Sequence, residues 1–378
     1  MWKKNKIKIL LISIVLMMLP ITGCRAGNSA GLDAGSDTPA ETESIRLIFA
    51  GDVMGHTTQH KGAWRDGGDS CYNFIPTFRF VKDYISSADL AIANLEVTFD
   101  GEPYTGYPTF SSPRSLAVAL YDAGFNLLVT ANNHIMDRGV KGLERTLDVL
   151  ESIGFAHTGS FRDSLARKQN NPLIMDINGF RLAFLNYTYA TNMAAPVPPF
   201  IVNYLDTARI VADLDRCRAM TPDYIIACVH WGDEYQNDEN ETQRQQADFL
   251  ARNGCNLIVG SHPHVVQPMK KIAVQDADSA LVAYSLGNFV SNQRWRYSDG
   301  GVMLDVTLTK TGDMVSLQSY KYEPFWVHRY PNNNVQIYRL ILIDDYLKNP
   351  EQYPDVTARD EKMLLQFYRD TKRFANEF

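Results

Sequence analysis

Between Ile45 and about Asn288, short apolar runs alternate with segments in which apolar residues recur every three or four positions. The short runs are continuous, which is typical of strands buried on both faces of a sheet. We expect strands at 45–50, 90–93, 127–130, 182–186, 224–229, 256–259 and 281–285, and helices at 115–123, 140–153, 207–218 and 241–253. This order predicts an α/β fold with a largely parallel sheet core and helices outside it.

The pattern changes after Gly301. Residues 302–309 alternate between apolar and polar, a turn-forming segment follows at 311–313, and residues 314–322 resume the character of a strand. This arrangement predicts a β-hairpin. Residues 355–374 are charged and predict a C-terminal helix, whose docking face would be Met363, Leu364, Phe367 and Tyr368.

The N-terminus has the features of an export signal. Four lysines among the first eight residues precede an apolar run at 9–19, and Gly23 precedes Cys24. We expect a bacterial lipoprotein signal in which Cys24 is lipidated, holding the protein on the extracytoplasmic face of the cell membrane. An uncleaved anchor is the alternative, but a membrane span needs about 20 apolar residues.

Residues 25–43 are rich in Gly, Ala, Ser, Thr and Asp and lack apolar periodicity, so they predict a flexible tether. The expected organisation is therefore a signal peptide at 1–24, this tether, a globular domain at 44–330 and a C-terminal extension at 331–378.

The net charge of the chain limits the kind of binding partner that we expect. The formal net charge of −6 becomes −10 once the four N-terminal lysines are removed, which argues against a nucleic-acid partner. An anionic substrate would then need local positive charge, which bound metal would supply. Four basic residues that follow the last polar motifs form a possible cationic rim, although each alone fits a solvated surface: Lys270, Lys271, Arg294 and Arg296.

The cysteines beyond Cys24 include no C-x-x-C pair. We expect mostly buried thiols, while one or two disulfides remain possible in an exported chain. The residues concerned are Cys71, Cys217, Cys228 and Cys255.

Five of the eight histidines lie at the ends of predicted strands, each beside a carboxylate, an amide or another histidine. The carboxyl ends of parallel strands meet at one edge of a sheet, where ligands bind. Imidazole nitrogens and carboxylate oxygens suit divalent transition metals. We therefore predict a metal site built from Asp52, Glu96, Asn133, His230, His262 and His264.

The roles within this set differ. Glu96 can give one oxygen to each of two metals held about 3.5–4 Å apart. The amide oxygen of Asn133 is a neutral ligand, and the adjacent His134 is a candidate proton donor that Asp137 would orient. We expect an extended segment to direct His262 and His264 the same way.

Other polar or aromatic residues near the strand ends are weaker candidates for metal or substrate contact, because each also fits a turn or cap. They are His56, Asn94, Trp231, Glu234 and Asn288, and Tyr187 is expected at the rim of the same face. Trp231 would form an aromatic wall. No Walker loop, G-x-G-x-x-G or G-x-S-x-G is present, which removes the simplest nucleotide and serine-hydrolase interpretations.

With these residues assembled, the chain resembles the bacterial CapA family of capsule (poly-γ-glutamate) synthesis proteins over about residues 45–289. Six ordered motifs carry the resemblance: Phe49-Ala50-Gly51-Asp52-Val53-Met54, Ala93-Asn94-Leu95-Glu96, Ala131-Asn132-Asn133-His134 with Asp137 and Gly139, His230-Trp231-Gly232-Asp233-Glu234-Tyr235, Gly260-Ser261-His262-Pro263-His264 and Tyr284-Ser285-Leu286-Gly287-Asn288-Phe289.

That family resembles the calcineurin-like metallophosphoesterases, which implies a four-layer αββα sandwich around two divalent metals. Manganese, iron and zinc are not distinguished. The resemblance implies the same six ligands, with His134 as proton donor. Here His56 stands four residues after Asp52 in place of an Asp-x-His motif, and Glu96 replaces a bridging aspartate.

The expected function is that of a metallohydrolase-like protein in poly-γ-glutamate or capsule synthesis or export, acting on an anionic polymer or a phosphoester. Membrane subunits of a synthesis complex are possible partners. The alternative is a non-catalytic accessory subunit that binds the anionic polymer.

Overall fold

The computed structural model describes residues 42–274 and 279–375. The predicted signal peptide, Cys24 and most of the tether lie outside the described residues. Thr42 and Glu43, which we assigned to the tether, already belong to the first strand. Among the described residues, no helix is both long enough and apolar enough to cross a membrane.

The continuous apolar runs form buried strands, as predicted, and these strands are arranged in two sheets at the centre of the described chain. The larger sheet has the order β16-β15-β14-β1-β2-β3-β4, with β13 paired to β1, and the smaller sheet has the order β11-β12-β10-β9-β7-β6. The strands of the larger sheet are β1 (Thr42–Val53), β2 (Leu90–Leu95), β3 (Leu127–Val129), β4 (Ala156–Thr158), β13 (Asn288–Val290), β14 (Gly300–Thr311), β15 (Met314–Asn332) and β16 (Val335–Leu342). The smaller sheet contains β6 (Leu173–Ile177), β7 (Phe180–Thr188), β9 (Tyr224–His230), β10 (Leu257–Ser261), β11 (Met269–Ala273) and β12 (Ser279–Ala283). A separate short pair consists of β5 (Ser160–Phe161) and β8 (Ile201–Val202).

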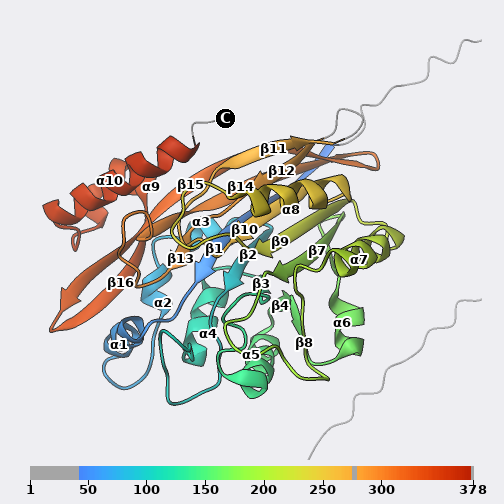
Figure 1. The fold of residues 1–378 in the computed structure, drawn as a ribbon. Helices are drawn as coiled ribbons and strands as arrows, with labels where there is room; N and C mark the ends of the chain where they lie inside the picture. The colour runs from blue at the N-terminus through green and yellow to red at the C-terminus, as the bar shows by residue number, and fades with distance from the viewer. Residues whose placement is uncertain (1–41, 275–278, 376–378) are drawn as a thin grey trace, which may run out of the picture. The chain divides into compact units, whose positions relative to one another are not determined.

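The two sheets pack face to face through one apolar layer. Leu47 and Phe49 of β1 belong to the same buried cluster as Phe184 of β7, Ile226 of β9 and Leu257 of β10. Because alternate residues of a strand face opposite sides, the remaining side chains of these strands pack against helices. The predicted four-layer αββα architecture is therefore confirmed (Figure 1).

Helices cover the outer face of each sheet. Those that pack on the larger sheet are mainly α1 (Thr57–Asp66), α2 (Ile75–Phe78), α3 (Lys82–Ser86), α4 (Arg114–Asp122) and α5 (Gly139–Ile153). Those beside the smaller sheet are α6 (Ser164–Asn170), α7 (Thr207–Ala219) and α8 (Glu241–Arg252). All four helices expected from sequence are present, within one residue at each end.

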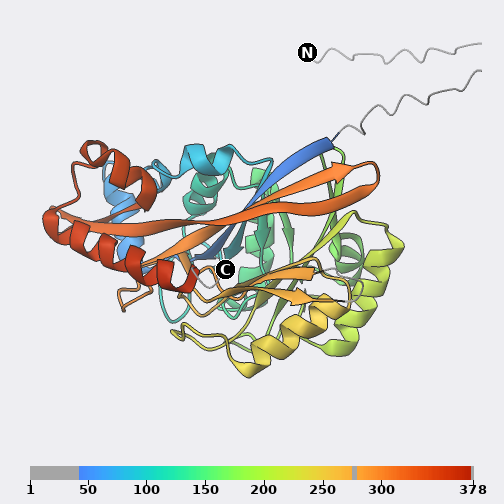
Figure 2. The ribbon, with the colours of Figure 1, turned by 90° about the horizontal axis from the view of Figure 1, so that it is seen from above.

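The predicted C-terminal hairpin and helix are also confirmed. The hairpin is the long β14–β15 pair that crosses Figure 2, and the helix α10 (Ala358–Ala375) lies near one end of it. Between them are α9 (Ile343–Lys348) and a 3-10 turn (Pro350–Gln352).

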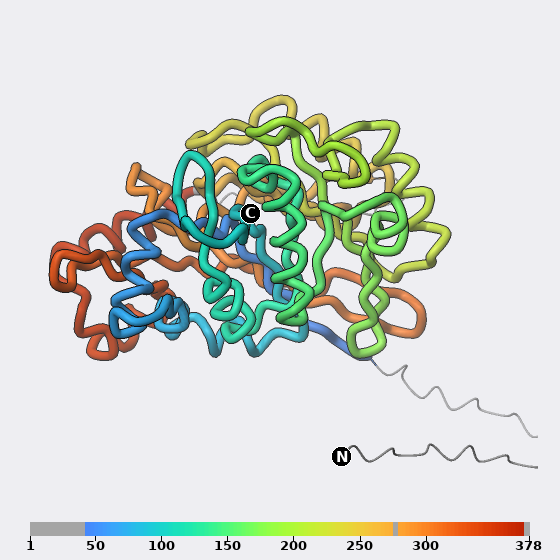
Figure 3. The backbone as a smooth tube through the Cα atoms, turned by 90° about the horizontal axis from the view of Figure 1, so that it is seen from below, coloured from blue at the N-terminus to red at the C-terminus, as the bar shows by residue number. Residues whose placement is uncertain are grey.

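The sequence analysis missed the strands β4, β6, β11, β13 and β16 of the two sheets, and β16 is the longest of them. The boundary that we drew at residue 330 falls inside β15, and β16 continues the same sheet after a turn at Asn333 and Asn334, where φ is 46° and 66°. Figure 3 shows α1 beside this C-terminal strand, and Arg339 of β16 forms an ion pair with Asp66 of α1. The C-terminal region is thus tied into the main fold.

Candidate metal centre

The larger sheet contributes oxygen atoms at the carboxyl ends of three neighbouring parallel strands. Asp52 is the penultimate residue of β1, Glu96 directly follows β2, and Asn133 lies in the turn after β3. Asp52 and Glu96 are completely buried. Asp52 pairs in register with Asn94 of β2, so Glu96 lies two residues further along the neighbouring chain segment.

The smaller sheet contributes nitrogen atoms. His230 is the last residue of β9, and His262 and His264 follow β10, which is parallel to β9. The rings of His230 and His262 are 4.7 Å apart, and those of His262 and His264 are 6.0 Å apart. All three imidazoles are buried at the junction of the two sheets.

The sequence placed His262 and His264 in an extended segment, and that geometry is wrong. Their φ angles are +101° and +59°, in the region that L-residues rarely adopt. The rings converge because the chain curls after β10, with the N–H of His262 donating to Asp52 at 3.4 Å. Strained backbone of this kind persists where surrounding contacts hold it, and it often marks functional sites.

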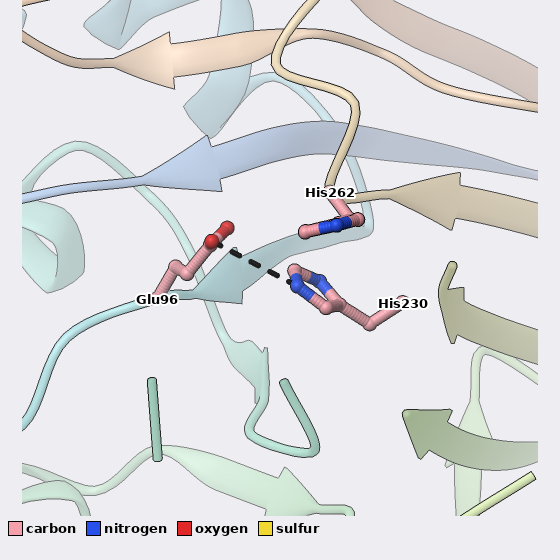
Figure 4. A group of neighbouring side chains, drawn as sticks. All are labelled: Glu96, His230 and His262. Carbon is pink, nitrogen blue, oxygen red and sulfur yellow. Dashed lines mark ion pairs between the residues drawn. The ribbon is translucent and has the colours of Figure 1, made fainter. Parts of the chain in front are cut away.

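Two groups of ligand atoms share Glu96. The first is Glu96, His230 and His262, and the second is Asp52, Glu96 and His264; the ligand atoms of each group lie within 4.8 Å of one another. Figure 4 shows Glu96 directed at His230 and His262. Asn133 adds its Oδ1 atom, 3.1 Å from His230 Nε2, to the first group. The structure therefore brings together all six predicted ligands.

The Asn94 side chain bridges the two buried carboxylates. Its Nδ2 donates to Asp52 at 2.8 Å and to Glu96 at 3.0 Å. Its Oδ1 accepts from Asn132, whose amide also donates to the Leu95 carbonyl. Asn94 thus holds both carboxylates in place.

Burial sets the protonation states of the cluster. Burial, together with the neighbouring charge of Asp52, raises the pKa of Glu96 well above its usual value. Burial lowers the pKa of His262 to about 3 and that of His230 well below its ordinary value. Burial acts most strongly and raises the pKa of Asp52, but its contacts with His264 at 2.9 Å, with Asn94 at 2.8 Å and with Glu96 together outweigh burial, and the net pKa is lowered. Neutral imidazoles of this kind have lone pairs available for a metal.

Unpartnered polar atoms test whether a metal fits. Among the described residues, Glu96 Oε1 and His262 Nδ1 are buried without a hydrogen-bond partner. Leaving such atoms unpaired costs about 1–3 kcal/mol each, so native structures rarely keep them without a reason. Both atoms belong to residues of the first ligand group, and imidazole with carboxylate is a donor set suited to zinc, manganese or iron. The residues present fit a divalent metal.

His134 and Asp137 form a separate pair beside the ligands. His134 Nδ1 lies 2.7 Å from Asp137 Oδ2, and the same carboxylate oxygen accepts from the backbone N–H of Phe110 at 2.8 Å. The ring of Phe110 packs edge-on against His134 at 4.7 Å. Asp137 therefore fixes the orientation of the imidazole, as the sequence predicted.

The weaker candidates lie in three different settings around the centre. His56 caps α1 and receives the N–H of Asn292 at 3.3 Å, outside both ligand groups. Glu234 is exposed near Tyr189 and Tyr235. Asn288 is buried and donates to the backbone carbonyl of His264 at 3.3 Å, so it supports a ligand.

Two aromatic candidates belong to the core. Trp231 is 1% exposed and its Nε1 donates to the Tyr284 carbonyl at 2.9 Å, so the predicted aromatic wall is not at the site. Tyr187 is also buried, with its hydroxyl donating to Asp213 of α7, and it is not at the rim. Strand alternation explains this, because Tyr187 shares its face of β7 with Ala183 and Leu185.

The predicted basic rim does not form as one group. Lys270 pairs with Glu239, and Lys271 lies over the Tyr320 ring, both on the edge strand β11. Arg296 pairs with Asp370 of α10. Arg294 is different, since its Nε and Nη2 atoms are buried and unpartnered.

Four residues at the centre were not predicted. Ser261 Oγ lies 3.0 Å from His230 Nδ1, and Asn192 Nδ2 lies 3.4 Å from His134 Nε2. Exposed Tyr189 packs against His262 at 4.8 Å, and Tyr235 lies 5.9 Å from His264. Ser261 precedes a ligand in the sequence, which was an available signal, whereas Asn192 comes from a loop without a regular pattern.

Comparisons with a family model and with known sequences both match bacterial capsule synthesis proteins. The family model described as bacterial capsule synthesis protein PGA_cap matches residues 46–293. The chain is 28% identical over 289 residues to the PGA biosynthesis protein CapA of Bacillus subtilis (strain 168), covering 71% of this chain and 69% of that protein. It is 27% identical to the capsule biosynthesis protein CapA of Bacillus anthracis, covering 73% and 66%.

Solved structures give weaker likenesses. The calcineurin-like phosphoesterase YfkN from Bacillus subtilis is similar with a TM-score of 0.47 and 12% identity, covering 89% of this chain and 99% of that chain. A 5'-nucleotidase from Candida albicans has a TM-score of 0.43 and 13% identity, covering 87% and 58%.

Proposed function

The chain belongs to the bacterial capsule synthesis protein PGA_cap family, and on that premise we propose that it acts in the synthesis or export of an anionic capsule polymer, poly-γ-glutamate, as a metal-dependent hydrolase. One observation carries the catalytic part of the proposal. Glu96 is common to two groups of buried ligands, one completed by His230 and His262 and the other by Asp52 and His264. A shared carboxylate between two ligand groups is the arrangement used by two-metal hydrolases.

The metals would be held by these residues and Asn133, and when bound they would supply an activated water and polarise the bond to be cleaved. His134 would protonate the leaving group. Its Nδ1 is held by Asp137 at 2.7 Å, which leaves Nε2 as the atom that carries the transferred proton. The substrate bond is a phosphoester or a γ-glutamyl amide.

We further propose that lipidation of Cys24 anchors the protein on the extracytoplasmic face of the cell membrane, where the polymer emerges. Metabolic labelling with a tagged fatty acid tests this. The label should appear on the wild-type chain and be absent from Cys24→Ala. Equal labelling of both would contradict the anchor.

The catalytic proposal is tested with the purified full-length protein loaded with manganese, iron or zinc. Hydrolysis of a phosphodiester and of a γ-linked glutamate oligomer is measured for the wild type, His134→Ala and His264→Ala. His134→Ala should bind metal as the wild type does and lose about 10²–10⁴-fold in turnover, the usual contribution of a general acid. His264→Ala should lose metal as well as turnover.

A matched control is His157→Ala, which removes a partly buried histidine that pairs with the exposed Glu151 and belongs to neither ligand group. It should leave metal content and turnover unchanged. If the metal-loaded wild type is as inert as His134→Ala on both substrates while it still binds the oligomer, the protein is a binding subunit and the hydrolase proposal is wrong.

A further inference from the structure

A second charged site lies between the C-terminal helix and the sheet. A cavity of about 310 Å³ is lined by Arg294, Arg329 and Arg359, together with Trp326, Thr357 and Asp360. We call the three arginines and this cavity the arginine pocket. The three arginines come from segments that are far apart in sequence: the segment after β13, strand β15 and the start of α10.

Unpaired charge distinguishes this pocket. Most arginines of the described chain form an ion pair, but none of the three has a carboxylate within 4.0 Å among the described residues. Arg294 donates from Nη1 to the Val327 carbonyl at 2.8 Å, while its Nε and Nη2 atoms are buried without partners. Burial lowers the pKa of Arg294 to about 10, and the charge of Arg329 acts in the same direction.

The single acidic residue of the lining does not neutralise the arginines. Asp360 accepts from the backbone N–H of Thr357 at 3.0 Å and from its hydroxyl at 2.6 Å, and it faces His328 at 3.5 Å. Asp299 lies near Arg294 but accepts from the Trp326 indole at 2.8 Å. Placing like charges together without counter-ions is unfavourable unless a bound anion compensates them.

Direct contacts connect the pocket to the metal centre. Arg329 donates to the side chain of Asn292 at 3.1 Å, and the backbone N–H of Asn292 donates to His56 at 3.3 Å. Asn288, four residues earlier on the same segment, supports the His264 backbone. The segment between Asn288 and Asn292 therefore contacts both the arginine pocket and the backbone of the ligand His264.

We infer that the arginine pocket binds carboxylate groups of the anionic polymer and so anchors the chain next to the metal centre. The identity of the polymer rests on the proposed function. Guanidinium groups form paired, charge-assisted hydrogen bonds with carboxylates, which suits a polymer that repeats this group. Phosphate has similar chemistry, so the experiment must separate the two.

The test measures binding of a fluorescently labelled γ-linked glutamate oligomer to the full-length protein by fluorescence anisotropy, with and without metal. Arg329→Gln and Arg359→Gln should each weaken binding by about fivefold to tenfold, the loss expected for one charge-assisted contact. Arg359→Lys should retain part of the affinity. Arg369→Gln is the matched control, because Arg369 is an exposed residue of the same helix outside the cavity lining and should have no effect.

Thermal melting of each variant checks folding, since Arg359 is exposed and its loss should not alter stability. Wild-type affinity for the oligomer in both glutamine variants would overturn the inference. The inference would also be overturned if the arginines were required for binding of inorganic phosphate but the protein did not bind the oligomer. The two proposals fail separately. If the arginine variants bind the oligomer as the wild type does, metal-dependent hydrolysis can still be observed. If the wild type does not hydrolyse either substrate, oligomer binding that depends on the arginines can still be measured without metal.

Discussion

Asp52 shows how single residues build the centre. It pairs in register with Asn94 on one side and with Asn288 on the other, so a carboxylate stands between two amides across three strand ends. Asn94 holds Asp52 and Glu96, while Asn288 holds the backbone of His264. Asn94 therefore hydrogen-bonds two buried carboxylates that are 44 positions apart in the sequence.

The position of Trp231 gives a prediction at this scale. In Trp231→Phe the buried Tyr284 carbonyl loses its donor, so the free energy of unfolding should fall by about 1–3 kcal/mol. Metal content should not change, because the side chain packs away from the ligands. Urea unfolding and elemental analysis measure the two quantities. If the variant lost metal without losing stability, Trp231 would instead have a role at the metal site.

The ligands were predictable because each follows a continuous apolar run, a pattern that places polar atoms at a sheet edge. Tyr187 was misplaced because its strand continues to Thr188, so strand alternation turns its side chain toward α7. Tyr189, past the strand end, is the tyrosine that packs on His262. The misplacement of Tyr187 arose because β7 ends at Thr188, two residues beyond the strand end at residue 186 that the sequence predicted.

At the scale of elements, the sharp curl after β10 depends on close packing before it. Gly260 lies on β10 with ordinary backbone angles, but a Cβ there would overlap the Tyr284 carbonyl oxygen and the Trp231 indole. Neither neighbour is free to move, because the Trp231 indole donates a hydrogen bond to the Tyr284 carbonyl oxygen. The need for glycine here is therefore steric.

Gly260→Ala should lower the free energy of unfolding by about 3 kcal/mol and weaken metal binding, because β10 leads directly into His262. Gly312→Ala is the control. Its φ of +62° disfavours alanine, but nothing lies within 4 Å, so it should cost about 1 kcal/mol and leave metal binding unchanged. Denaturant unfolding and metal titration compare them. An equal loss in the free energy of unfolding for the two variants would contradict the steric explanation for Gly260.

A buried ion pair joins β14 to β1 and α3. Asp305 accepts from Arg46 at 2.8 Å and from Tyr84 at 2.6 Å. Burial acts to raise the pKa of Asp305, but the hydrogen bonds from Arg46 and Tyr84 and the charges of Arg46 and Lys321 together outweigh burial, and the pKa is lowered. A lowered folded-state pKa stabilises the fold above the ordinary pKa and loses this effect as pH falls through the lowered value.

Asp305→Asn should therefore cost about 2 kcal/mol near pH 7, and the difference from wild type should shrink below about pH 4. Urea unfolding across this range measures it. Asp313→Asn, in the exposed turn of the same hairpin, should show no such dependence. A constant difference at every pH would exclude a contribution from the carboxylate charge.

The strand β16 was missed for a physical reason. Its sequence carries a recognisable Asn-Asn turn with two positive φ angles, a hairpin signal, but Pro331 precedes it and interrupts the strand pattern. Pro331 is tolerated close to the end of the long β15. The core strands β1, β2, β3, β7, β9, β10 and β12, by contrast, were predicted because continuous apolar runs have few other stable environments.

At the scale of the whole described unit, the two sheets supply different chemistry. The larger sheet and its loops provide oxygen ligands from Asp52, Glu96 and Asn133, whereas the smaller sheet provides nitrogen ligands from three histidines. This division was not visible in the sequence, because the order of motifs does not reveal which strands pair. Bound metal would therefore join the two halves of the sandwich.

The central claim is a pair of metal positions that share Glu96, and metal stoichiometry tests it most directly. The full-length protein is loaded, freed of excess metal and analysed by mass spectrometry for metal per chain. The wild type should hold two divalent ions, Glu96→Gln should hold one at most, and the exposed control Glu234→Gln should match the wild type. Two ions retained by Glu96→Gln, or none bound by the folded wild type, would contradict the account.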